Sequence, residues 1–211
     1  SFPRHMSIKL LADRRDSMIA ECKKLGIEFI FATAPDPTKE GGVPAAQQFI
    51  LEDVPRQIKR YGKDTAFFCT NDAQTEPLIK KSLEGGAIFT EPDVPSPIMG
   101  YPGALGLKIP SDKAGDFGFI NSQIRAAVKK LGATGKAASW PIPVTILSMK
   151  AAADLYFQNN GDKSKFRDKA YLTQFLTKTA QDLAKEKVSV SLATYPGTQN
   201  YQLILLDSII Y

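Results

Sequence analysis

Segments typical of buried strands alternate with segments typical of amphipathic helices along most of this 211-residue chain. Residues 27–32 (IEFIFA), 65–70 (TAFFCT) and 87–90 (AIFT) are short runs made almost entirely of apolar or small residues. Such runs are typical of parallel strands that are covered on both faces. Because crossover helices alternate with them, we expect an α/β fold, with a mostly parallel sheet and helices on both of its faces.

The remaining elements continue the same alternation. Apolar residues recur at helical spacing in six segments, at residues 7–25, 45–61, 75–83, 116–131, 144–158 and 168–187. Pro55 falls inside the second of these helices and predicts a kink or a break there. Further strands are expected at residues 136–140, 188–194 and 201–210. A long loop, residues 91–107, is rich in proline and glycine, and loops of that length in a compact domain are usually functional.

The composition is that of a folded domain with an ordinary surface. Apolar residues make up 43% of the chain, and the formal net charge is +5. The lysine pairs lie near the ends of predicted helices, where cations complement the helix dipole, so we expect no nucleic-acid partner. We also expect no signal peptide within these residues, because no basic segment followed by an apolar run opens the chain.

The residues that usually carry catalysis are scarce. His5 is the only histidine, at the start of the chain, and we expect it to be exposed or a loop contact rather than a base. Cys22 and Cys69 are expected to be buried; free thiols are favoured, and one disulfide between them stays open. One histidine and two distant cysteines do not supply a zinc site, and nucleophile-elbow, phosphate-loop and dinucleotide motifs are absent. We therefore expect no enzyme, cofactor or metal.

Candidate binding residues follow the predicted strands. Ligands of open α/β sheets lie outside the carboxyl ends of the strands. Asn71 and Asp72 directly follow the strand at 65–70, where they could contact a ligand or cap the next helix. Trp140 ends the strand at 136–140, where it offers a flat apolar face to a sugar ring or an aromatic ligand, or packs in the core.

Three further places are weaker candidates. Residues 34–38 follow the first predicted strand, and Tyr101 lies in the long loop. Arg14 lies in the first predicted helix beside Arg15, where a guanidinium at the sheet's ligand edge could pair with a carboxylate or phosphate group. An exposed helical position is the alternative for both arginines.

Residues 65–83 (TAFFCTNDAQTEPLIKKSL) resemble the strand, Asn-Asp and helix element of type 1 periplasmic binding proteins and of the related sugar-responsive repressor cores. In that family the aspartate contacts the ligand, which implies this role for Asp72. Arg14 stands where the family carries an arginine three residues before a Gly-Phe pair, although Ser17-Met18 replaces that pair here. The resemblance implies a Rossmann-like lobe of a two-lobed protein that closes on its ligand.

The motifs SFPRHMS, TAPDPT, QQFILEDVPR and MGYPGALG resemble an uncharacterised group of bacterial lipoproteins with this fold, in which they belong to the second half of a longer chain. The resemblance implies that residues 1–211 form a ligand-binding lobe. It also implies that residues from about 140 to 211 cross to a first lobe absent from this sequence. An extracytoplasmic, membrane-anchored location and a permease or receptor partner are implied as well.

The sequence leaves two functions open. The chain is expected to bind a small polar solute between two lobes, as an extracytoplasmic solute-binding protein of the kind that serves ABC importers. The alternative is the effector-binding domain of a cytoplasmic transcription regulator.

Overall fold

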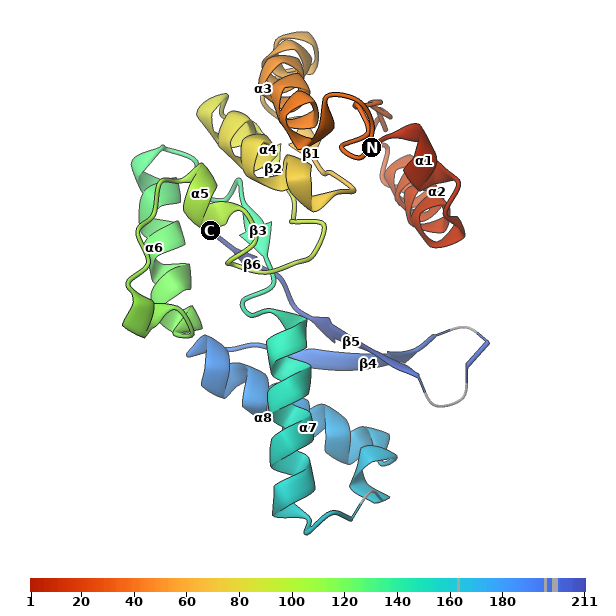
Figure 1. The fold of residues 1–211 in the computed structure, drawn as a ribbon, viewed down its shortest axis with the longest axis vertical. Helices are drawn as coiled ribbons and strands as arrows, with labels where there is room; N and C mark the ends of the chain where they lie inside the picture. The colour runs from red at the N-terminus through yellow and green to blue at the C-terminus, as the bar shows by residue number, and fades with distance from the viewer. Residues whose placement is uncertain (163, 196, 199–200) are drawn as a thin grey trace.

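The computed structural model describes residues 1–162, 164–195, 197–198 and 201–211. Its elements are listed here in chain order and drawn in Figure 1: α1 (Pro3–Met6), α2 (Lys9–Lys24), α3 (Gly42–Tyr61), β1 (Ala66–Phe67), α4 (Asp72–Glu84), β2 (Ile88–Phe89), α5 (Tyr101–Ala104), η1 (Ser111–Lys113), α6 (Phe117–Lys130), β3 (Ala138–Ser139), α7 (Val144–Gln158), η2 (Ser164–Phe166), α8 (Lys169–Ala184), β4 (Val190–Thr194), β5 (Gln202–Leu206) and β6 (Ile209–Ile210).

A small sheet of short strands organises the part of the molecule drawn at the top of Figure 1. β1 pairs with β2 in parallel, with Ala66 opposite Ile88. A parallel bridge from Phe89 to Ala137 joins β2 to the start of β3, and β6 then pairs with β3 antiparallel. The expected α/β fold is confirmed, and the three strands that follow one another along the chain run parallel.

Helices α3, α4 and α6 supply most of the apolar side chains that cover this sheet. Their fully or almost fully buried residues form one cluster with Phe89 of β2: Val54, Leu78, Ile79, Leu83, Ile120, Ile124 and Val128. Residues four apart recur in this set within α4 and α6, so each of these two helices places one apolar stripe in the core. α3 continues through Pro55, so the alternative of a break there was wrong.

After β3 the chain forms a second unit, drawn at the bottom of Figure 1. It contains α7, α8 and the antiparallel hairpin of β4 and β5, in which Val190 lies opposite Leu206. The chain enters this unit through residues 140–143 and returns through Asp207 and Ser208 into β6. β6 then returns to pair with β3, so only the part of the chain between them lies away from the parallel strands. That residues from about 140 to 211 cross to a further lobe stays a prediction.

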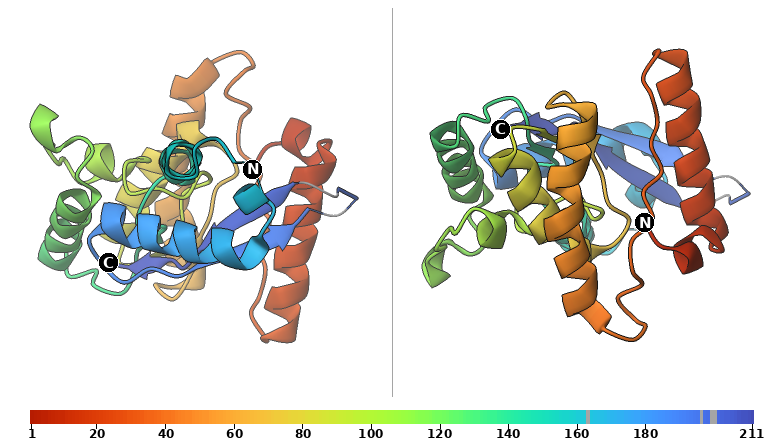
Figure 2. Two further views of the ribbon diagram at one scale, coloured as in Figure 1. Left: turned by 90° about the horizontal axis from the view of Figure 1, so that it is seen from below. Right: turned by 90° about the horizontal axis from the view of Figure 1, so that it is seen from above.

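The predicted strand at residues 27–32 is wrong for this structure. These residues are extended chain without sheet pairing, and Ile27, Ile30 and Phe31 are 56%, 42% and 44% exposed. Figure 2 (right) shows the segment running back alongside α2 toward the N-terminus. An apolar run becomes a strand only where a neighbouring strand satisfies its backbone groups, and no strand of the described residues lies against this one.

None of the helices in the described ranges combines the length and apolar character that crossing a membrane requires.

Replacing Leu83 by alanine should lower the free energy of unfolding by about 2–5 kcal/mol, because the side chain is 2% exposed and a cavity would remain. Leu10→Ala is the matched control: that side chain is 58% exposed, and its loss should cost less than about 0.5 kcal/mol. Urea unfolding followed by circular dichroism measures both. Equal effects at the two positions would contradict the core described here.

Candidate functional site

Polar and aromatic side chains gather where neighbouring parallel strands end. Asn71 and Asp72 follow β1, Asp93 follows β2 through Thr90–Pro92, and Trp140 follows β3 directly. Because β1, β2 and the start of β3 are adjacent and parallel, their carboxyl ends lie along one edge of the sheet. We refer to this side of the sheet as the carboxyl edge.

Asn71 is the N-cap of α4. Its side-chain oxygen Oδ1 accepts a hydrogen bond of 3.0 Å from the backbone N–H of Ala73. This is the structural alternative that the sequence left open for Asn71, and it fixes where α4 begins. The cap therefore orients the adjacent Asp72, the first helical residue, at the carboxyl edge.

Asp72 presents its carboxylate at the carboxyl edge. It takes part in none of the ion pairs found among the described residues. Desolvation, and then the negative charge of Asp93, raise the pKa of this carboxyl above its ordinary value. The Asp72 carboxylate can therefore accept hydrogen bonds or positive charge from another molecule.

Arg14 reaches the same edge from α2. One of its terminal nitrogens lies 2.8 Å from Oδ1 of Asp93, and its guanidinium lies 5.1 Å from the centre of the Phe68 ring. The structure therefore joins the predicted Arg14 to the loop that follows β2, a contact between residues far apart in the sequence. Here the partner of Arg14 is a carboxylate of the chain itself.

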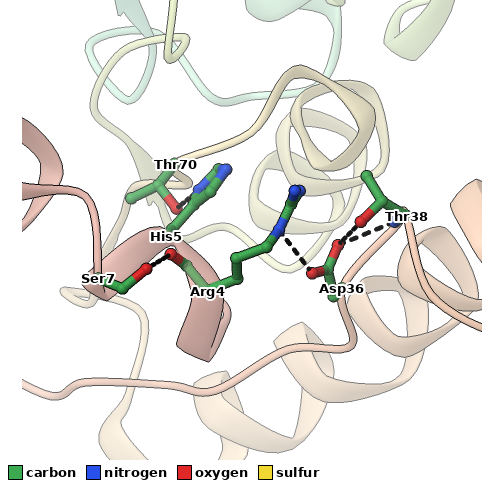
Figure 3. A network of polar contacts seen from close by, with 6 residues as sticks. All are labelled: Arg4, His5, Ser7, Asp36, Thr38 and Thr70. Atoms are coloured by element: carbon green, nitrogen blue, oxygen red, sulfur yellow. Dashed lines mark hydrogen bonds and ion pairs between the residues drawn. The ribbon is translucent and has the colours of Figure 1, made fainter.

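His5 also lies at the carboxyl edge, which the sequence gave no reason to expect (Figure 3). Its Nδ1 is 3.2 Å from the hydroxyl oxygen of Thr70, and that hydroxyl donates to the Ser1 hydroxyl at 3.0 Å. Which of the two groups donates depends on the tautomer of the His5 ring. Burial lowers the pKa of His5, and the ring packs against Phe2 with centroids 3.7 Å apart.

The candidate residues 34–38 form a turn held by Asp36. Its carboxylate accepts hydrogen bonds from the backbone N–H and the hydroxyl of Thr38, each 2.8 Å long, and from Nε of Arg4 at 3.1 Å (Figure 3). Although desolvation acts in the opposite direction, these bonds lower the pKa of the Asp36 carboxyl. Asp36 is thus satisfied within the protein and serves to position Arg4 next to His5.

Tyr101 does not join this group, and Trp140 stands at its border. The Tyr101 ring is fully buried, its hydroxyl donates to the backbone oxygen of Ala138 at 2.7 Å, and it packs edge-on against Phe89. The structure therefore places Tyr101 in the core beneath the carboxyl edge. Trp140 is half-buried and packs against the core.

Both cysteines are free. Cys69 is buried, with its sulfur 3.5 Å from the hydroxyl oxygen of Thr75, whereas Cys22 on α2 is only half-buried. Across the described ranges there is no group of three histidine, cysteine or acidic side chains that could hold a metal ion.

A hollow of about 310 Å³ lies at the other end of α4, bordered by Lys80, Glu84, Leu105 and Lys130. Lys80 and Glu84 follow Asp72 by two and three helical turns, so this hollow is separate from the carboxyl edge.

Comparison with known proteins places the chain in a family. Residues 1–138 match the family described as "Protein of unknown function (DUF3798)", and the chain belongs to that family. An uncharacterised protein of Treponema pallidum (strain Nichols) is 40% identical over 107 residues, which are 51% of this chain and 48% of that protein. The matched segment thus spans about half the length of this relative.

One solved structure is similar over the entire chain. It is the crystal structure of a "putative transcriptional regulator" from Clostridium difficile 630, with a TM-score of 0.82 and 27% sequence identity. The similarity covers 100% of this chain and 59% of that one. The α/β fold is therefore shared with a longer protein.

Replacing His5 by glutamine should remove part of the pH dependence of stability. Burial lowers the pKa of His5 in the folded protein, whereas the unfolded chain keeps the ordinary pKa of about 6.5. Between these two pKa values the unfolded chain therefore binds more protons than the folded protein. Stability therefore rises with pH through the window between the two pKa values and is lost as the pH falls through it. Melting temperatures measured across that window should have a smaller slope in H5Q than in the wild type; identical slopes would contradict the half-buried placement.

Proposed function

We propose that this member of the DUF3798 family binds a small polar solute at its carboxyl edge, as part of an extracytoplasmic solute-binding protein of the type that serves ABC importers. The observation that carries the proposal is the convergence of Asp72, Asp93 and Trp140 at the ends of three adjacent parallel strands. Ligands of open α/β sheets are bound in this position. The edge combines acceptor groups with an aromatic face, which suits a hydroxyl-bearing ring such as a sugar or a nucleoside.

Each side chain has a distinct part in the proposed binding. The Asp72 carboxylate accepts hydrogen bonds from hydroxyl or amino groups of the solute, and such charge-assisted bonds are about twice as strong as neutral ones. Trp140 packs its ring face against the apolar face of the solute. Arg14 is held in place by Asp93 and could exchange that partner for an anionic group of a ligand.

The course of the chain supports a lobe that moves relative to a second one. Two segments, residues 140–143 and Asp207–Ser208, connect the parallel strands with the unit of α7, α8, β4 and β5 (Figure 1). The Ser208 hydroxyl donates a 2.9 Å hydrogen bond to Glu91, which lies two residues after β2. The carboxyl edge is thus tied to a connecting segment, which is where closure around a ligand would act.

A second candidate function comes from the comparison. The Clostridium difficile protein is described as a transcriptional regulator, which favours the same unit acting as an effector-binding domain in the cytoplasm. The two functions differ in the N-terminal part of the intact protein. A lipid-modified cysteine after a signal sequence supports the solute-binding protein, whereas a helix-turn-helix supports the regulator, and cell fractionation distinguishes the two compartments.

Ligand addition should change the fluorescence of this chain, because Trp140 is its only tryptophan. The probes are a panel of free sugars and nucleosides, added to saturation. We expect at least one to shift the emission, and the shift should disappear in D72N. The control is D64N, which removes an exposed aspartate at the opposite end of β1 and should leave the response intact.

D72N should fold normally and melt at an unchanged or slightly higher temperature. The raised pKa of Asp72 means that its ionised form is disfavoured in the folded state, so stability from this group is present at low pH and lost as pH rises through the folded pKa. Removing the charge at neutral pH therefore costs no stability. Lost binding together with a large drop in melting temperature would assign Asp72 a structural role instead.

A further inference from the structure

Ser1 occupies the position of a residue within a parallel strand. Its amino nitrogen donates to the carbonyl of Ala32 at 3.2 Å, and its own carbonyl accepts from the N–H of Ala34 at 2.6 Å. In a parallel ladder one residue bonds in this way to the two residues that flank its partner. Ser1 is therefore paired opposite Thr33, as the last residue of a strand would be.

The chain between Ser1 and residues 27–34 has the course of a βαβ unit. α1 and α2 lead from Ser1 to residues 27–34, and a helix that joins two parallel strands normally packs its apolar stripe on both of them. No residue of α2 is buried. The apolar side chains exposed on α2 and on the following segment are Leu10, Ile19, Leu25, Ile27, Ile30 and Phe31.

β1 also has one side that is not paired with β2, and this side faces the region next to Ser1. The carbonyls of Thr65 and Phe67 accept from the N–H groups of Ile88 and Thr90 in and beside β2. Because backbone groups alternate in direction along a strand, those of Ala66 face away from β2. The hydrogen bond between the hydroxyls of Thr70 and Ser1 brings the end of β1 next to Ser1.

We propose that the space between residues 27–34 and β1 holds one further strand, parallel to both, formed by the backbone that leads into Ser1 in the intact protein. Ser1, the last residue of this strand, already bonds to the carbonyl of Ala32 and to the N–H of Ala34. The residue two positions before Ser1 would bond in the same way to the carbonyl of Ile30 and to the N–H of Ala32. The strand would be predominantly apolar, because α2 and the apolar residues listed above would cover it.

Two independent observations agree with this occupant. The amino group of Ser1 lies in a desolvated position, which lowers its pKa and is unfavourable for a charged chain end. The similar Clostridium difficile protein is longer than this chain, which is covered completely and matches 59% of that protein. A covalently continuous strand removes the charge and needs no partner chain.

The proposed strand would also order the carboxyl edge. The proposal holds whether or not a ligand binds there. It would end at Ser1, between the segment that leads to Asp36 and the strand that leads to Asp72. Phe2 and His5 would then be held at the edge by a central strand of the sheet. The exposed apolar face of α2 would become buried in the same step.

Hydrogen exchange tests the proposal through the alternation of backbone groups. In the intact protein, the amides of Ile30 and Ala32 should exchange about tenfold or more slowly than in the chain that begins at Ser1. The amides of Phe31 and Thr33, which point the other way, serve as internal controls and should change less. Equal exchange of Ile30 and Ala32 in the two proteins would overturn the proposal.

A pair of proline variants of the intact protein gives a second measurement. A32P removes an N–H that faces the proposed strand and should lower the melting temperature by several degrees, since a ladder bond is lost in the middle of a sheet. T33P removes an N–H on the outer side, where proline is tolerated at an edge, and should lower it less. If T33P is as damaging as A32P, residues 27–34 do not border a further strand.

Discussion

The backbone pairing of β2 holds this molecule together. Phe89 is fully buried at its centre; its N–H donates to the carbonyl of Lys136 at 2.8 Å, and Thr90 donates to Phe67 on the other side. These bonds fix three short strands in parallel although each contains only two residues. Because α3, α4 and α6 pack on this ladder, the positions of Asp72, Asp93 and Trp140 all depend on it.

Stability and binding make opposite demands at the carboxyl edge. Asp36 and Arg4 are satisfied by each other and by Thr38, so they strengthen the turn in which they lie. Asp72 has no ion-pair partner among the described residues, and desolvation, followed by the nearby charge of Asp93, raises its pKa. The ionised form of this carboxyl is disfavoured in the folded state, and a ligand that donates hydrogen bonds to it would offset that cost. The same arrangement suits a transport protein and a sensor, which differ in what the ligand-bound form contacts.

Local sequence signals predicted the residues whose position depends on their neighbours in the chain. A buried run followed by Asn71, Asp72 and a helix is a local pattern, and the structure reproduces it with Asn71 as the cap. Tyr101 lies in the core because β3 and β6 return beside it, which no local pattern reports. His5 was missed for the same reason, since its partner Thr70 lies 65 residues away. Residues 27–32 show the converse: their apolar pattern indicates burial in a sheet, but pairing needs a neighbour that these residues do not encode.

Native mass spectrometry of the gently purified intact protein tests the central claim, that the carboxyl edge holds a small polar solute. The account predicts a species heavier than the polypeptide, which loses the additional mass on denaturation, and the loss of that species in both D72N and W140A. The retained mass would also identify the class of solute. A wild type without additional mass, or an additional mass that persists in both variants, would contradict the account.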